Sequence, residues 1–97
     1  MKTSNEVSTH YQIYRETVLA DITKIVAEHM EQPEDEIGEN AHLINDIGCD
    51  SLDITEIIML IEDHFDIDIP EDNVEDARTP GQVADGLFKL LGNIEND

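Results

Sequence analysis

Apolar side chains recur at spacings of three and four residues in three blocks of this 97-residue chain, and this is the spacing of one face of an α-helix. The blocks cover residues 7–30, 51–65 and 83–91. Residues 67–69 alternate isoleucine with aspartate, but the chain offers no second run that would pair with them as a strand. We therefore predict an all-α fold, a small four-helix bundle of three longer helices and one short turn near residues 72–77.

Local signals predict where these helices begin and end. Asp50 is the expected N-cap of the second helix. Before the last helix, Thr79 is expected to cap and Gln82 to complete a capping box, while Gly92-Asn93 is expected to end that helix. Residues 31–50 are acidic and contain Pro, Gly and Asn, so we predict a long loop between the first and second helices.

The charge of the chain limits the partners it can have. The formal net charge is −19, from 24 acidic and 5 basic residues, and no basic residue lies between Lys24 and Arg78. Such a surface excludes a basic binding site for nucleic acid and favours partner proteins with basic patches. We expect no membrane insertion, because no apolar stretch approaches the length of a span and no apolar leader follows Met1. The single Cys49 fits a reducing cytoplasm, and we expect a cytoplasmic monomer.

Ser51 stands at the predicted start of the second helix, within Asp50-Ser51-Leu52-Asp53. A hydroxyl there sits on a rigid platform, and the helix dipole and free N–H groups would favour a phosphodiester formed on it. Serine is also a common residue at helix starts, where it only caps. The four residues alone therefore leave both interpretations open, and the surrounding sequence decides between them.

The stretch from Asp46 to Pro70 resembles an acyl carrier protein. The positions that match the family pattern are Gly48, Asp50, Leu52, Asp53, Glu56, Phe65, Asp66, Ile69 and Pro70. In that family the serine of Asp-Ser-Leu carries a covalent 4′-phosphopantetheine arm, so the resemblance implies attachment at Ser51 by a phosphopantetheinyl transferase. The resemblance covers residues 16–91, with residues 1–15 as an N-terminal extension that continues the first helix and residues 92–97 as a flexible tail.

The resemblance implies a carrier without catalytic activity. Such a carrier tethers acyl intermediates as thioesters and presents them to fatty-acid, polyketide or related lipid-synthesis enzymes. The second helix would be the recognition helix, and its expected partner-binding residues are Asp50, Leu52, Asp53, Glu56, Met59, Glu62 and Asp63. The family also shields the acyl chain between its helices, and the candidate lining residues are Leu43, Ile54, Ile57, Ile61, Val83 and Leu87.

Several other functions compete with this interpretation. An aminoacyl or peptidyl carrier shares the fold, but its motif usually has two glycines, and Gly48-Cys49-Asp50-Ser51 has one. A non-carrier acidic interaction module would leave Ser51 unmodified. A cysteine nucleophile at Cys49 would need His42 or His64 as a base, and the chain predicts no oxyanion site. The four histidines lack the mutual spacing of metal ligands, so no metal site is expected.

Overall fold

Four α-helices and no strand make up the part of the chain that the structure describes, residues 4–74 and 76–95, with side chains described for residues 15–72, 74 and 76–91. The structure is a computed structural model. The helices are α1 (Ser4–Met30), α2 (Ser51–Phe65), α3 (Glu71–Val74) and α4 (Pro80–Glu95). The prediction of an all-α bundle with three longer helices and one short one is confirmed. None of the helices in the described residues is both long and apolar enough to cross a bilayer.

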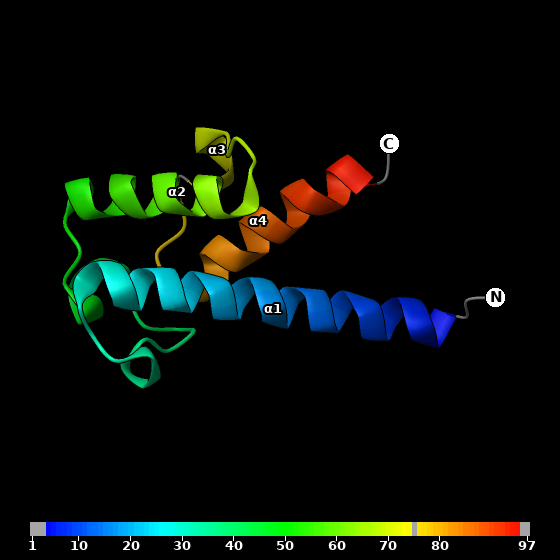
Figure 1. Ribbon diagram of the computed structural model, residues 1–97, viewed down its shortest axis with the longest axis horizontal. Helices are drawn as coiled ribbons and strands as arrows, with labels where there is room; N and C mark the ends of the chain where they lie inside the picture. The colour runs from blue at the N-terminus through cyan, green and yellow to red at the C-terminus, as the bar shows by residue number, and fades with distance from the viewer. Residues whose placement is uncertain (1–3, 75, 96–97) are drawn as a thin grey trace.

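Helix α1 is the longest of the four helices. It packs against both α2 and α4, and α3 packs against α4. Figure 1 shows α1 and α2 lying side by side and running in opposite directions, while α4 crosses at an angle and α1 continues toward the N-terminus beyond the end of α2. Because α1 begins at Ser4, the helix already includes most of residues 1–15.

The core lies where α1, α2 and α4 meet. Its buried side chains are Val18, Ile22 and Val26 from α1, Ile57 and Ile61 from α2, and Val83, Ala84 and Leu87 from α4. Burying each of the larger ones contributes about 1.5–3 kcal/mol relative to leaving it in water. These residues come from the three apolar blocks of the sequence, so the helical spacing and the observed packing agree.

The segment between α1 and α2 is the predicted long loop, and it contains two short helical turns. They are a 3₁₀ turn, Glu34–Glu36, and a π-helical turn, Leu43–Ile47. The second turn forms because Leu43 and Ile47 are buried in the core and because His42 caps it. The Nδ1 atom of His42 accepts the N–H groups of Ile44 at 3.2 Å and Asn45 at 3.0 Å. The predicted loop is thus present, and its two short turns are a detail that the sequence did not predict.

Three hydrogen bonds hold this segment in place. The N–H of Leu43 donates to the carbonyl of Arg78 at 2.8 Å, and Gln32 Nε2 donates to the carbonyl of Ile47 at 2.9 Å. The N–H of Gly81 donates to the carbonyl of Glu39 at 2.9 Å. A Cβ atom on Gly81 would lie 2.6 Å from the Cγ of Glu39, so any other residue at this position would require Glu39 to shift.

The start and the end of α4 differ in part from the prediction. Thr79 caps as expected, accepting the N–H of Gln82 on its Oγ1 at 3.2 Å. The side chain of Gln82 accepts the N–H of Arg78 at 2.6 Å, so the bond reaches one residue further back than in the predicted capping box. The helix also continues past Gly92 to Glu95, because a glycine lowers helix propensity by about 1 kcal/mol without breaking the hydrogen-bonding pattern.

Candidate functional site

Ser51 is exposed and is the first residue of α2. Gly48 precedes it with a φ of 96°, a left-handed conformation that suits glycine, and the chain then turns into the helix. Asp50 is the N-cap, as predicted, and forms a capping box with Asp53. The Oδ1 of Asp50 accepts the N–H of Asp53 at 2.8 Å, and the Oδ2 of Asp53 accepts the N–H of Asp50 at 3.1 Å. Because Asp50 caps the helix, the hydroxyl of Ser51 is not required for that purpose.

Cys49, two residues before Ser51, is buried, with 3% of its surface exposed. Burial raises the pKa of its thiol, and the negative charges of Asp53 and Asp50 raise it further. A reactive thiol needs the opposite environment, in which positive charge favours the thiolate. The proposed bases also have other roles, since His42 caps the π-helical turn and His64 lies 3.2 Å from a carboxylate oxygen of Asp21. The geometry therefore favours a structural Cys49 over a nucleophile.

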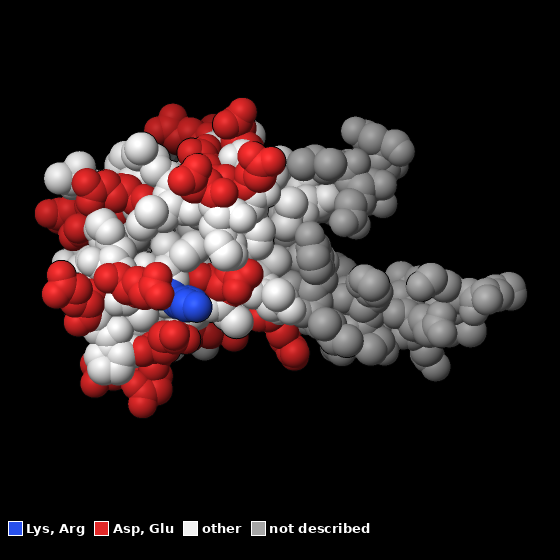
Figure 2. Space-filling view, viewed as in Figure 1, with Lys and Arg blue, Asp and Glu red and all other residues white. Residues whose placement is uncertain are grey.

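The predicted partner-binding residues of α2 divide into exposed and half-buried groups. Asp50, Leu52, Glu56, Met59 and Asp63 are exposed, whereas Asp53 and Glu62 are half-buried. The carboxylate of Glu62 accepts the N–H of Ile69 at 2.8 Å, and Asp53 belongs to the capping box described above. Figure 2 shows acidic side chains dominating the charged surface around α2, α3 and the segment before α2, with little basic surface among them.

The sequence did not single out two further exposed apolar side chains, Leu60 of α2 and Ile44 of the π-helical turn. Leu60 is 44% exposed and Ile44 is 50% exposed, beside Leu52 at 62% and Met59 at 60%. Leu60 lies on α2 away from the stripe of Ile54, Ile57 and Ile61, which was a usable signal. Ile44 gave none, since its exposure depends on the π-helical turn that the sequence did not predict. The outer face of this region thus combines apolar side chains with carboxylates.

The candidate acyl-cavity residues mostly belong to the packed core. Leu43, Ile57, Ile61, Val83 and Leu87 are buried, and Ile54 is half-buried. A surface groove of about 720 Å³ has a different lining, which includes His29, Glu56, Met59 and Leu60. None of the six candidates lines this groove. Their role around an acyl chain stays a prediction.

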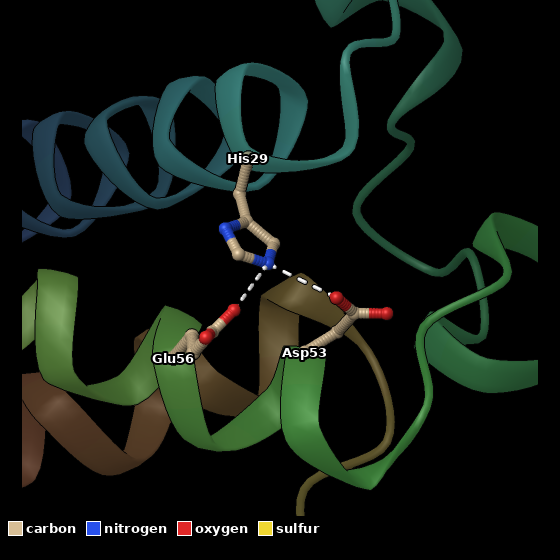
Figure 3. A group of neighbouring side chains, drawn as sticks. All are labelled: His29, Asp53 and Glu56. Carbon is tan, nitrogen blue, oxygen red and sulfur yellow. Dashed lines mark hydrogen bonds and ion pairs between the residues drawn. The ribbon is translucent and has the colours of Figure 1, made fainter.

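His29, in the last turn of α1, contacts two carboxylates of α2 (Figure 3). Its Nε2 lies 3.1 Å from the Oδ1 of Asp53 and 3.3 Å from the Oε1 of Glu56. The pKa of the Asp53 carboxyl is held below its usual value, chiefly because the N–H of Asp50 donates to it and also because of His29. The sequence did not predict this group, because His29 lies 24 residues before Asp53 and the histidines were compared only with one another.

Several known proteins are similar to this chain in sequence or in fold. A family model described as "Phosphopantetheine attachment site" matches residues 20–87. An acyl carrier protein from Phenylobacterium zucineum is 40% identical over 75 residues, which cover 77% of this chain and 95% of that protein. One from Caulobacter vibrioides is 42% identical over 67 residues, or 69% of this chain and 86% of that protein. A solved structure of the acyl carrier protein from Enterococcus faecalis matches with a TM-score of 0.63 and 27% identity, covering 77% of this chain and 95% of that one.

Proposed function

We propose that Ser51 is the attachment site in this chain, which belongs to the acyl carrier protein family and is an acyl carrier with a covalently attached 4′-phosphopantetheine. The observation that carries the proposal is the position of Ser51, exposed as the first residue of α2 directly after an N-cap supplied by Asp50. The other two serines of the chain, Ser4 and Ser8, precede the matched residues 20–87. The alternatives of a peptidyl carrier and an unmodified module are not favoured.

Loading forms one phosphodiester bond and breaks one phosphoanhydride bond. The Oγ of Ser51 attacks the phosphorus that joins phosphopantetheine to the nucleotide of coenzyme A, the hydroxyl proton passes to a base of the transferase, and adenosine 3′,5′-bisphosphate leaves. The new phosphodiester then carries its negative charge at the N-terminus of α2, where the helix dipole favours it. The thiol at the far end of the arm holds the acyl group as a thioester, so the chain itself needs no catalytic residue.

Partner recognition is assigned to the exposed face of α2. Asp50, Glu56 and Asp63 present carboxylates, and Leu52 and Met59 present apolar surface between them. This combination supports docking on basic patches, first of a phosphopantetheinyl transferase and then of acyl-transferring and synthase enzymes, by electrostatic steering followed by apolar contact. The buried, unpaired Cys49 supports a reducing cytoplasmic location, and we infer a monomeric carrier.

Coenzyme A, a phosphopantetheinyl transferase and intact-mass measurement test the assignment of Ser51. The wild type should gain one phosphopantetheine group, mapped by peptide mass spectrometry to the peptide that contains Ser51. Ser51→Ala should gain none while keeping its helical circular dichroism, because Asp50 supplies the cap. Ser8→Ala is the matched control and should load like the wild type. An adduct on Ser51→Ala, or an unmodified wild type, would show that the assignment is wrong.

A further inference from the structure

We propose that His29, Asp53 and Glu56 form a binding site for one divalent transition-metal ion, with Zn²⁺ as the best match, that ties the end of α1 to the start of α2. Figure 3 shows the imidazole of His29 pointing from α1 toward both carboxylates on α2. One ligand atom from each residue lies within 4.8 Å of the other two. The cluster combines an imidazole nitrogen with two carboxylate oxygens, which is a donor set that proteins use for zinc.

The distances fit an ion at the centre of the group. Zinc binds imidazole nitrogen and carboxylate oxygen at about 2.0–2.2 Å, which places two ligands of a tetrahedral site about 3.3 Å apart. The Nε2 of His29 lies 3.1 Å from the Oδ1 of Asp53 and 3.3 Å from the Oε1 of Glu56. The two distances from His29 therefore match the spacing of ligands around one zinc ion, and the ligand atoms of all three residues lie within 4.8 Å of one another.

The backbone already orients one of the ligands. The Oδ2 of Asp53 accepts the N–H of Asp50, so this carboxylate is held with its Oδ1 toward His29. Asp53 and Glu56 are three residues apart and therefore share one face of α2. Ligands on helices that pack against each other are held more rigidly than ligands on loops, and α1 packs against α2.

Charge and access favour an ion in the same place. Glu56 is exposed, and both His29 and Glu56 line the surface groove of about 720 Å³, so an ion can enter and keep water in its remaining positions. The other charged residues of the groove lining are Glu62, Asp63, Asp66 and Asp68. When the imidazole is neutral, an ion supplies positive charge to this acidic surface.

The nitrogen ligand separates this site from general cation binding by acidic surface. Ca²⁺ takes six to eight oxygen ligands and Mg²⁺ prefers octahedral oxygen, whereas imidazole favours zinc and its neighbours among the transition metals. His64 is the natural comparison within the chain, because its Nε2 lies 3.2 Å from a single carboxylate, that of Asp21. A site built on His29 therefore predicts metal selectivity and dependence on one particular histidine.

Calorimetric titration of the metal-free protein with ZnCl₂ tests the proposal. We expect one Zn²⁺ to bind well above the affinity for CaCl₂ or MgCl₂. His29→Gln should weaken Zn²⁺ binding by about 100-fold, since even the outer partners of metal ligands are worth about 10–100-fold. His64→Gln, the matched control, should bind like the wild type. In a spectrum of the imidazole nitrogens, Zn²⁺ should shift the His29 signal and leave that of His64 in place.

The outcome does not depend on the function proposed for Ser51, because Ser51→Ala should bind Zn²⁺ like the wild type. Glu56→Gln provides a second test if His29→Gln fails to fold, since Glu56 is exposed and its removal should weaken binding by about tenfold or more. Zn²⁺ binding no tighter than Ca²⁺ binding would overturn the proposal. Wild-type affinity in the folded His29→Gln variant, or in Glu56→Gln, would overturn it as well.

Discussion

Among its described side chains, α1 supplies a base to a pair of acidic residues at Arg15 and again at His29, and the two contacts differ in the kind of cation. The Nη2 of Arg15 lies 2.9 Å from the Oε2 of Glu39, and the Nε of Arg15 lies 2.8 Å from the Oδ1 of Asp85. Its two carboxylate partners raise the pKa of Arg15 above a value that is already high, so this contact is charged at every ordinary pH. At His29 the same arrangement of one base and two carboxylates depends on a proton or, as proposed above, on a metal ion.

The two contacts join α1 to different parts of the bundle. The Arg15 contact joins α1 to α4 and to the segment before α2 through a cation that stays charged at every ordinary pH. The His29 contact joins α1 to the helix that begins at Ser51, and one of its two acids, Glu56, belongs to the face proposed to contact partners. Unlike a guanidinium, a neutral imidazole has a ring nitrogen that can bind a metal ion, as proposed above.

The largest effect that tests this contrast concerns the loading of Ser51. Glu56→Lys should slow loading by about tenfold at low salt, because it reverses a charge on the docking face and steering of charged partners is worth about 10–1000-fold in association rate. Asp85→Lys is the matched control, an exposed acid of the Arg15 contact, and should load at nearly the wild-type rate. Added salt should reduce the difference. Equal slowing in both variants would remove the distinction between the two ends.

A smaller effect concerns stability at the Arg15 contact. Arg15→Gln should lower the free energy of unfolding by about 0.5–1 kcal/mol, because the paired groups are partly exposed and screened by water. The loss, measured by urea unfolding, should be the same at pH 6 and pH 8 within about 0.3 kcal/mol, since the guanidinium does not titrate in that range. A loss that changes strongly between these pH values would contradict a permanent contact.

The smallest effect concerns the acid side of the His29 contact. The pKa of Asp53 in the folded protein lies below its usual value, so the carboxylate stabilises the fold above about pH 4 and this contribution is lost as pH falls through the folded pKa. Asp53→Asn should therefore melt below the wild type at pH 7, and the gap should close on acidification. Thermal melts from pH 7 down to pH 3 measure it, and a constant gap would show that charge is not its cause.

Much of the fold and the position of Ser51 were predictable because they depend on local sequence. The helical spacing of apolar residues located α1, α2 and α4, and Asp50 was recognised as an N-cap from its type and place alone. Such signals need only residues within one or two turns of one another. The exposure of Ser51 follows from the same local pattern.

The features that the sequence did not predict depend on contacts between distant residues. The π-helical turn forms because Leu43 and Ile47 reach the core and Leu43 bonds to Arg78, which is 35 positions away in the chain (78 − 43). The group of His29, Asp53 and Glu56 exists only after α1 packs on α2. Periodicity and spacing within one helix contain no information about which faces meet, so neither feature was accessible before the fold was known.

The bonds from Leu43 to Arg78 and from Gly81 to Glu39 hold the segment before Ser51 against the body of the protein, and the bond from Gln32 to Ile47 closes the segment on itself. On the proposed assignment of Ser51, the arm begins directly after this packed segment. The cargo explores a region whose centre is set by the position of α2 and whose radius is set by the length of the arm. The reaction centre of an enzyme that binds α2 thus has to lie within one arm length of Ser51.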